Sequence, residues 1–422
     1  MDNRTRNTFF GFLFVSLVLG FVSCGKKDGQ KAAGQSAQNN IPVDTALQGK
    51  IRKFATKPRC KGAFGLYVYD LTADKPLYAD SEHTPQPSAS CMKLLSGVGG
   101  LHFLGTNYHY KSYLYVNGTM SVDTLKGDIA FKGDLDPQLY ADNVRNMFHV
   151  FKIRGIRKIT GKMYLDLLMH DPVRAEQHWY PADLTLSKYS VLHRGDDLIK
   201  KTALSSSRQE GIQVNDDQVV IGKVPRGAHP IFCQQRNINL VIQRMWKNSA
   251  NTQATSLLYT IGHTYKPNEA DMPKAGIEYL WKFINEELKS KEKGIVIHDG
   301  CGLCTHDQLT PYFLCEILRY GYAHKDIYNM LQQFLAVSGV DGTLRHLPQE
   351  IRGKVHAKTG TLSHPYGISS LAGYATAANG HILCFAIMDS QMSVLDAHVL
   401  QNDLCQILVS DPYAKSNNKR RK

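Results

Sequence analysis

The sequence predicts an α+β fold in which a layered main domain is interrupted by a β-rich insertion. Strand-like apolar runs lie near both ends of the folded part, at residues 64–69 and 368–388, and helical patterns lie between them. Strands at both ends with helices between them fit an α+β layered domain. Between about residues 112 and 235, short apolar runs alternate with Gly and Asp turns, and helical periodicity is absent over most of this stretch.

The first elements are a hairpin and a helix. Residues 64–69 form a β-rich run, and a turn at residues 72–76 separates it from a short second strand around Leu77 and Tyr78. A helix is expected to begin at Ser90. Glycines 97, 99 and 100 weaken that prediction, because glycine costs helix stability.

The later helices and strands follow clearer signals. Thr310 and Pro311 form a good helix start, with a capping side chain followed by proline at the first helical position. The segment 274–289 places Ile277, Leu280 and Ile284 on one face, as an amphipathic helix does. Helices are therefore expected at 238–246, 256–261, 274–289, 312–322 and 394–409, and strands at 368–375 and 382–388.

Composition indicates a globular protein with a basic surface. The 422 residues are 43% hydrophobic and 9% aromatic, which argues against disorder as the main state. The net charge of +13 would suit a polyanionic partner, or simply a solvated basic surface on an envelope protein. No basic run is interleaved with aromatic residues as single-strand binders require, so we expect no nucleic-acid partner.

The N-terminus indicates export and lipidation. Arg4 and Arg6 precede an apolar stretch at residues 9–22, which is short for a membrane span. It ends in Phe-Val-Ser-Cys, which resembles a bacterial lipobox, so Cys24 is expected to carry lipid and anchor the protein to a membrane. An uncleaved anchor is the alternative. Either reading places the folded part in the bacterial cell envelope, on the periplasmic side.

These signals divide the chain into segments. The stretch after Cys24 is rich in Gly, Lys, Gln, Ala, Asn and Ser, which is typical of a flexible tether. The expected segments are a lipoprotein signal peptide at 1–24, a tether at 25–45, the main domain at 46–111 and 236–412, the insertion at 112–235, and a basic tail at 413–422.

Nine cysteines are scattered through a chain that is too large to need disulfides for stability. We expect mostly buried or free thiols. Cys301 and Cys304 form a Cys-x-x-Cys pair, with His298 and His306 nearby. A structural zinc needs four ligands, and only these two histidines are near in sequence, so the sequence predicts no metal and no cofactor.

Three short motifs carry the chemistry. Ser90 and Lys93 are three residues apart, so on a helix the amine reaches the hydroxyl. A serine hydroxyl needs a base to become a nucleophile, and a lysine amine acts as one only when its pKa is lowered. Ser249 and Asn251 form the second motif, and residues 358–360, Lys-Thr-Gly, form the third. Each is weak alone, but the trio in this order is typical of penicillin-binding proteins and class A β-lactamases.

Longer segments strengthen this indication. From about residue 60 to 410, the chain resembles the class C penicillin-binding proteins, the D-alanyl-D-alanine carboxypeptidase/endopeptidase family. The resemblance rests on residues 68–71, 87–90, 133–137, 299–303, 339–345, 358–362 and 371–374. It implies the DD-peptidase/β-lactamase-like transpeptidase fold, an antiparallel sheet flanked by helices with a helical subdomain, into which the β-rich domain is inserted.

The resemblance also implies catalytic roles. Ser90 attacks the carbonyl of a D-Ala-D-Ala bond in a peptidoglycan stem peptide and forms an acyl-enzyme, while Lys93 takes its proton. Ser249 relays a proton to the leaving amine, and Asn251 holds Lys93 and the substrate amide. Water then releases the product, whereas a β-lactam would trap the enzyme.

Substrate binding is implied for the third motif. Lys358 and Thr359 bind the terminal carboxylate through charge-assisted hydrogen bonds, and Gly360 lets the substrate backbone approach closely. The backbone N–H groups of Thr361 and Ser90 form the oxyanion hole.

The chain departs from the family pattern at several positions. Ala250 replaces an Asp, Thr255 replaces a Glu, and Cys301 and Cys304 replace serines. About 155 residues separate the first two motifs, so we expect one inserted domain where larger members have two.

Trp179 and Asp183 resemble a family element that faces the amine of the substrate side chain. A buried Trp beside a surface Asp explains them equally well.

Two other functions stay open. A non-catalytic wall-binding lipoprotein would fit the altered loop and Ala250. A β-lactamase would need a base for deacylation, and no Glu-x-x-Leu-Asn element supplies one. The sequence leaves open whether the enzyme is a carboxypeptidase or an endopeptidase, because both cleave after a D-Ala carbonyl.

Overall fold

The computed structural model describes residues 41–58, 62–180 and 190–413. Several features predicted from the sequence lie outside these ranges: the signal peptide with Cys24, most of the tether, Asp183 and nearly all of the basic tail.

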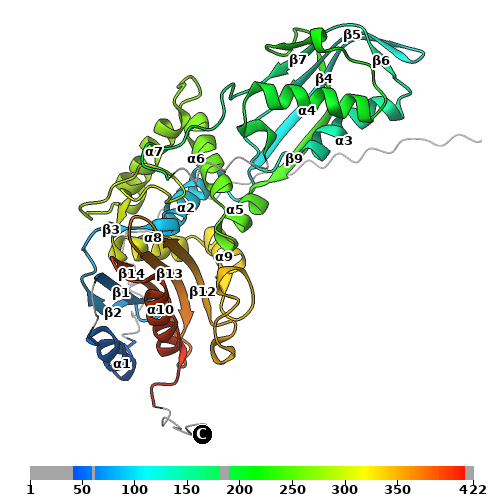
Figure 1. Cartoon of the computed structure of the whole chain (residues 1–422). Coiled ribbons are helices and arrows are strands. Elements are labelled where there is room, and N and C mark those ends of the chain that lie inside the picture. Colours follow the sequence, from blue (N-terminus) through cyan, green and yellow to red (C-terminus); the bar gives the residue numbers. More distant parts are fainter. Residues whose placement is uncertain (1–40, 59–61, 181–189, 414–422) are drawn as a thin grey trace, which may run out of the picture. The chain divides into compact units, whose positions relative to one another are not determined.

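One antiparallel sheet organises the main domain. Its strand order is β11-β12-β13-β14-β1-β2, so a strand from the start of the folded chain pairs with one from its end (Figure 1). The strands are β11 (Ala336–Val337), β12 (Val355–Leu362), β13 (Ile368–Thr376), β14 (Ile382–Ser390), β1 (Ala63–Asp70) and β2 (Lys75–Asp80). The predicted hairpin and the two predicted C-terminal strands are present in this sheet.

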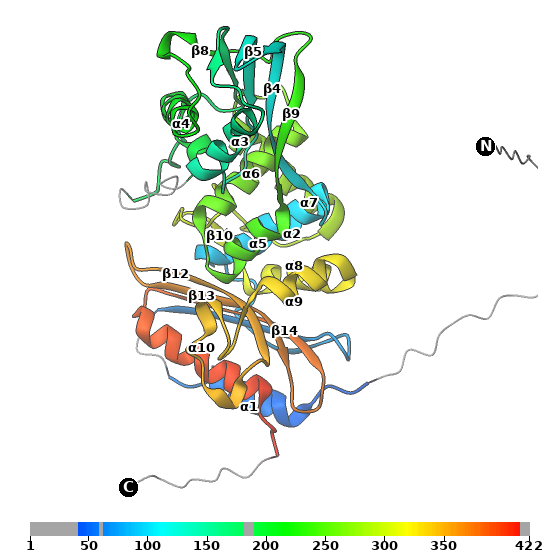
Figure 2. The ribbon, with the colours of Figure 1, turned by 90° about the vertical axis from the view of Figure 1, so that its right-hand side faces the viewer.

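Helices cover both faces of this sheet, as Figure 2 shows. On one face, α1 (Thr45–Ala55) and α10 (Val394–Val409) share an apolar core with the strands. On the other face, a larger core joins the sheet to a group of helices. These are α2 (Met92–Leu104), α5 (Ile238–Lys247), α6 (Asn251–Tyr265), α7 (Met272–Phe283), α8 (Pro311–Ala323) and α9 (Lys325–Phe334).

The predicted helices form, with changes at their ends. The last helix has the predicted bounds, and α8 begins as expected, with the Thr310 hydroxyl accepting a hydrogen bond from the Phe313 N–H at 3.0 Å. The expected helix at 274–289 is divided into α7 and a five-residue π-helix, Ile284–Leu288. The helix expected at 256–261 extends over all of α6.

A second sheet is formed by the segment that was predicted as the insertion. Its order is β8-β7-β5-β4-β9, with β6 pairing with β5. The strands are β4 (His109–Ser121), β5 (Thr124–Lys132), β6 (Lys158–Ile159), β7 (Met163–Asp166), β8 (Val219–Ile221) and β9 (His229–Asn237).

The insertion also contains two helices that the β-rich interpretation missed. They are α3 (Ala141–Ile153) and α4 (Asp196–Gln209), which share an apolar core with the second sheet. In α3 the buried residues Val144, Met147, Phe148 and Phe151 follow helical spacing. The expectation that helical periodicity is absent was therefore incomplete, because this pattern sits between two strand-like segments.

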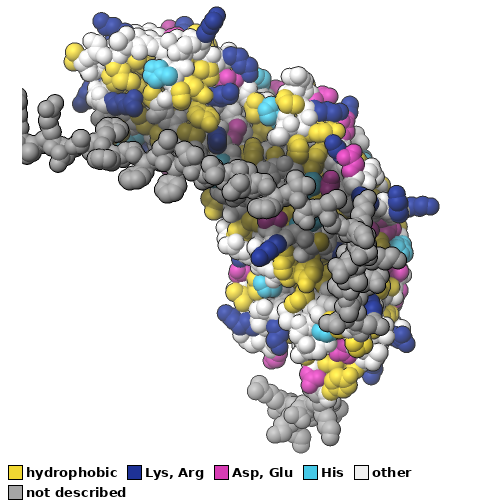
Figure 3. Space-filling model, turned by 180° about the vertical axis from the view of Figure 1, so that it is seen from behind, with side chains coloured by type: hydrophobic (Ala, Val, Ile, Leu, Met, Phe, Trp, Pro, Cys, Tyr) yellow, Lys and Arg dark blue, Asp and Glu magenta, His cyan; other side chains and the backbone are white. Residues whose placement is uncertain are grey.

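Surface and cysteine patterns add two observations. On the part of the face in Figure 3 that grey atoms leave visible, Lys and Arg side chains are dispersed among other types. The seven cysteines among the described residues are free, and all except Cys233 are buried. This confirms the expectation of buried or free thiols.

None of the helices in the described ranges is long and apolar enough to cross a membrane.

Candidate active site

Ser90 lies in a strained turn that leads into α2. The short 3₁₀-helix Ala89–Cys91 precedes α2, and Ala89 has φ of +44°, a left-handed conformation that non-glycine residues seldom adopt. Ala89 and Cys91 are fully buried, whereas Ser90 is only partly buried. The turn therefore presents the Ser90 hydroxyl at the edge of the core.

Lys93 lies at the centre of a buried hydrogen-bond network. Its Nζ donates to Ser90 Oγ at 2.8 Å, to Asn251 Oδ1 at 2.7 Å and to the Cys301 carbonyl oxygen at 2.6 Å. The side chain has no exposed surface, and burial lowers the pKa of its amine. A lowered pKa is what a lysine needs to accept a proton from a serine.

Trp246 of helix α5 contacts the backbone of Lys93. The indole Nε1 of Trp246 donates to the Lys93 carbonyl oxygen at 2.8 Å, and Trp246 is itself fully buried. A Cβ on Gly97 would lie 2.6 Å from the same indole ring. Gly97, one of the glycines that weakened the helix prediction, is therefore required for the packing of Trp246 against α2.

The second motif occupies the turn between α5 and α6. Ser249 has φ of +58°, and Asn251 is the first residue of α6. The Lys247 side chain forms an ion pair with Asp341 at 2.6 Å, which ties the end of α5 to the segment that follows β11. This turn aims the Asn251 amide at Lys93 and the Ser249 hydroxyl at Lys358.

Lys358, on β12, forms the other half of the site. Its Nζ donates to Ser249 Oγ at 2.8 Å and to the Thr359 carbonyl oxygen at 2.5 Å. The side chain has no exposed surface; burial, and then the charge of Lys93, lower the pKa of its amine. Two buried lysines, each bonded to a serine hydroxyl, therefore share this site and disfavour each other's charge.

The rest of the third motif follows β12 past Ser90. Thr359 Oγ1 donates to Thr343 Oγ1 at 2.9 Å, and Thr361 Oγ1 lies 3.3 Å from His398 Nε2. A Cβ on Gly360 would lie 3.0 Å from the backbone nitrogen of Ser90. Glycine is needed here because β12 passes so close to the turn that holds Ser90.

The altered loop at residues 299–304 also reaches Lys93. The Asp299 carboxylate accepts the backbone N–H groups of Cys301 at 2.8 Å, Gly302 at 2.5 Å and Cys304 at 2.9 Å. This arrangement directs the Cys301 carbonyl at Lys93, and Ser96 Oγ donates to the Gly300 carbonyl at 2.7 Å. Sequence reasoning missed this contribution because it comes from the backbone.

Trp179 and Cys91 have defined contacts. The Trp179 Nε1 donates to Asp299 Oδ2 at 2.7 Å, so this residue supports the loop behind Lys93. The Cys91 thiol is fully buried, faces the Lys358 carbonyl oxygen at 3.3 Å, and has a pKa raised by burial. A thiol that resists ionisation fits a packing residue better than a second nucleophile.

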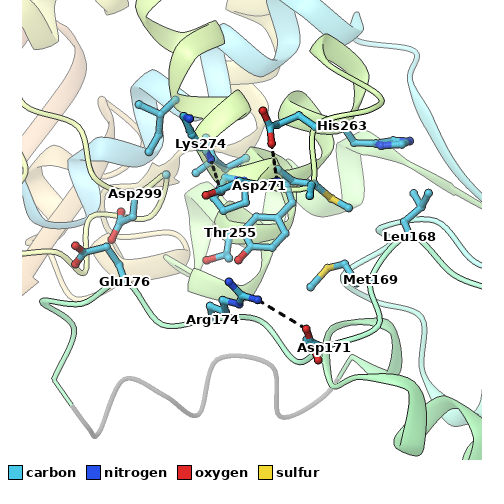
Figure 4. Close-up of a pocket in the computed structure, with 18 of the residues that line it drawn as sticks. Leu168, Met169, Asp171, Arg174, Glu176, Thr255, His263, Asp271, Lys274 and Asp299 are labelled. Carbon is cyan, nitrogen blue, oxygen red and sulfur yellow. Dashed lines mark hydrogen bonds and ion pairs between the residues drawn. The ribbon is translucent and has the colours of Figure 1, made fainter.

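A large cavity is lined in part by α6 and by the altered loop. Its volume is about 1020 Å³, and its lining includes Thr255, Asp299 and Gly300 but, among the described residues, none of the eight predicted catalytic and binding residues. Figure 4 shows Glu176 and Asp299 near one end of it. The buried Thr255 hydroxyl has no hydrogen-bond partner in the described structure. The cavity therefore borders the loop that supports Lys93 but does not contain the predicted catalytic and binding residues.

Comparison with known proteins agrees with this arrangement. The model of the D-Ala-D-Ala carboxypeptidase 3 (S13) family matches residues 47–191 and 191–409. The D-alanyl-D-alanine carboxypeptidase DacB of Haemophilus influenzae is 24% identical over 384 residues, which span 71% of this chain and 79% of the relative.

Two solved structures show the same fold. Penicillin binding protein 4 of Haemophilus influenzae has a TM-score of 0.68 at 17% identity, over 81% of this chain and 93% of that chain. A penicillin G acylated predatory endopeptidase from Bdellovibrio bacteriovorus, in complex with an immunity protein, has a TM-score of 0.54 at 16% identity, over 82% of this chain and 91% of that chain. The predicted fold class and the resemblance are confirmed.

Proposed function

Since this chain belongs to the D-Ala-D-Ala carboxypeptidase 3 (S13) family and is a serine hydrolase of that type, we propose that its reaction proceeds through an acyl-enzyme on Ser90. The observation that carries the proposal is the position of Lys93 Nζ, within hydrogen-bond reach of both Ser90 Oγ and Asn251 Oδ1. Nucleophile, base and orienting group are then in one connected network.

In the proposed acylation, Ser90 Oγ attacks the carbonyl carbon of the penultimate D-Ala, and its proton passes to neutral Lys93. The backbone N–H groups of Ser90 and Thr361 stabilise the developing oxyanion. Ser249 gives its proton to the amine of the departing D-Ala and regains one from protonated Lys93, so the proton taken from Ser90 leaves with the product. The hydrogen bond that Lys358 donates to Ser249 Oγ at 2.8 Å orients this hydroxyl. Asn251 holds the base and the substrate amide.

Lys358 and Thr359 are proposed to bind the carboxylate at the end of the stem peptide. The buried ammonium and the Thr359 hydroxyl lie on β12, and Gly360 leaves room beside Ser90 for the substrate backbone. A substrate carboxylate would compensate the positive charge that burial disfavours. Substrates and β-lactams that lack this carboxylate should therefore acylate Ser90 slowly.

A non-catalytic wall-binding protein is the second candidate function, motivated by Ala250 and the two loop cysteines. The hydrogen bond from Lys93 to the Cys301 carbonyl oxygen argues against it, because the altered loop contacts the proposed base. A β-lactamase would in addition require rapid deacylation.

Turnover assays separate these functions. Purified protein is incubated with a monomeric pentapeptide muropeptide and with a cross-linked dimer, and released D-alanine and monomers are quantified by mass spectrometry. We expect release of D-alanine from the pentapeptide, and none by the Ser90→Ala variant. Dimer cleavage would assign endopeptidase action as well. No turnover of either substrate by folded wild-type protein would favour the wall-binding function.

Lipidation is also proposed, from the lipobox-like sequence that ends at Cys24. The thiol would carry the lipid and hold the enzyme at the periplasmic face of a membrane. Metabolic labelling with a fatty acid should mark wild-type protein in the membrane fraction. The Cys24→Ala variant should be unlabelled; equal labelling would disprove the assignment.

A further inference from the structure

Four potential metal ligands from two distant segments meet beside the altered loop. Glu176 and His178 come from the segment that follows β7, and His298 and Cys304 come from the loop between α7 and α8. One donor atom of each lies within 4.8 Å of all the others. Cys304 is fully buried, and the other three are partly buried. Such a convergence of one thiol, two imidazoles and one carboxylate is a zinc-type donor set.

The distances fit a tetrahedral ion. Zinc bonds of about 2.0–2.3 Å place neighbouring ligand atoms roughly 3.3–3.8 Å apart in a tetrahedron. Cys304 Sγ lies 3.8 Å from His178 Nδ1, and His298 Nδ1 lies 3.8 Å from Glu176 Oε1. His178 Nδ1 and Glu176 Oε1 are 2.6 Å apart, a hydrogen bond that metal binding would replace by opening this pair by roughly 1 Å.

The backbone around these side chains is already fixed. The Cys304 N–H donates to Asp299 Oδ2 at 2.9 Å, and the His298 N–H donates to Asp307 Oδ1 at 2.6 Å. The His178 N–H donates to Glu176 Oε2 at 2.8 Å. Hydrogen bonds therefore hold the backbone at three of the four ligand positions.

Charge also favours a divalent ion. A Cys304 thiolate and the Glu176 carboxylate carry two negative charges, which Zn²⁺ neutralises, while both imidazoles bind in the neutral form. Binding releases the thiol proton to solvent. Four protein ligands fill a tetrahedral shell and leave no position for substrate, so the site is structural and takes no part in hydrolysis.

We propose that these four side chains form a structural zinc site that fastens the segment around Glu176 to the loop at residues 299–304. The same loop presents the Cys301 carbonyl to Lys93, and Asp299 also accepts the Trp179 indole N–H from that segment. Zinc would thus hold the loop that contacts Lys93 in place without touching Lys93 itself. Sequence spacing offered only His298 and His306 as partners for the cysteines, because Glu176 and His178 lie over 100 residues earlier.

Metal content tests the proposal directly. The full-length, untagged chain is purified in detergent and analysed by inductively coupled plasma mass spectrometry. We expect about one zinc per wild-type chain, loss of zinc in Cys304→Ser and His298→Ala, and full retention in Cys233→Ser. Cys233 is a suitable control because it is a free thiol outside the cluster. Zinc below a tenth of an equivalent in wild type, or full zinc in Cys304→Ser, would overturn the proposal.

A second measurement does not depend on the folding of the variants. Wild-type protein stripped by a chelator is titrated with Co²⁺, which should give intense tetrahedral d–d bands and a thiolate-to-cobalt charge-transfer band at one equivalent. The control Cys233→Ser should give the same spectrum. Weak octahedral bands alone would contradict the site. Because neither readout involves turnover, a failure here is distinguishable from a failure of the proposed function.

Discussion

The carbonyl oxygen of Cys301 lies 2.6 Å from Lys93 Nζ, so the altered loop contributes a backbone hydrogen-bond acceptor to this lysine. The cysteine side chain is fully buried and points into the core cluster. The contact therefore depends on the loop conformation, which the Asp299 carboxylate fixes, and not on the identity of residue 301. The loop can therefore carry Cys301 and Cys304 and still place this carbonyl against Lys93.

Lys358→Met should weaken recognition of carboxylate ligands. The substitution keeps the side-chain volume and removes a charged hydrogen bond, which is worth about 1.5–3 kcal/mol. The second-order rate of acylation by a penicillin should fall roughly 10- to 100-fold, measured by mass spectrometry over time. Lys358→Arg is the matched variant, because it keeps the charge. Equal rates in wild type and Lys358→Met would show that the carboxylate binds elsewhere.

Acylation should have a bell-shaped pH dependence with both limbs below the usual lysine pKa of 10.5. Burial lowers the pKa of Lys93 and of Lys358. The reactive form has Lys93 neutral and Lys358 charged, so the rate rises with pH as the pair loses its first proton and falls as it loses the second.

Stopped-flow acylation by a chromogenic β-lactam checks this pH dependence. In Lys358→Arg the alkaline limb should disappear, because arginine stays protonated. A rate that keeps rising up to pH 10.5 in wild type would contradict a lowered lysine pKa.

Ala250→Asp should stabilise the protein without changing its chemistry. Ala250 is the N-cap of α6 and provides no side-chain hydrogen bond to the helix. An Asp there can accept a backbone N–H of the first turn, worth about 1 kcal/mol. We expect Tm to rise by roughly 2 °C in differential scanning fluorimetry, with acylation rates within about threefold of wild type. A tenfold change in rate would give this position a chemical role.

His193 should make stability fall in mild acid. Burial lowers the pKa of its imidazole to about 4, from an ordinary 6.5. The unfolded chain therefore binds more protons between these values, so the stabilising contribution is complete above pH 6.5 and is lost as the pH falls towards 4. The loss amounts to about 3 kcal/mol.

Urea unfolding at several pH values tests this contribution. The His193→Gln variant keeps a polar side chain beside Ser190, the present partner of the imidazole at 2.9 Å. Its free energy of unfolding should fall by about 3 kcal/mol less than that of wild type between pH 7 and pH 4. Parallel curves for the two proteins would refute the buried neutral imidazole.

The sequence alone predicted those contacts of the site that join residues close together in the chain. Ser90 and Lys93 meet because they are one helical turn apart, and this spacing can be seen in the sequence. The contact between Ser249 and Lys358 joins residues 109 positions apart, so no local pattern indicated it. The family resemblance implied a role for each residue but not their contact. The Cys301 carbonyl had no signal at all, because backbone groups are the same at every position.

The missed helices have a different cause. In α1, Leu47, Ile51 and Phe54 are buried at helical spacing, but the preceding polar stretch masked the pattern. The start of α6 was set too late because threonines 252 and 255 lower helix propensity, whereas burial of the helix in the core outweighs that preference. Tertiary packing, which local patterns do not contain, decided both outcomes.

The measurement that tests the account most directly is intact-mass labelling with a penicillin. Wild-type protein should gain the mass of one penicillin per chain, and Ser90→Ala should gain none, because Ser90 Oγ is the proposed site of acylation. Lys93→Met, which keeps the volume of the buried side chain, should react at least 100-fold more slowly. A full-stoichiometry adduct on Ser90→Ala, or no adduct on folded wild-type protein, would contradict the assignment of Ser90 as the nucleophile.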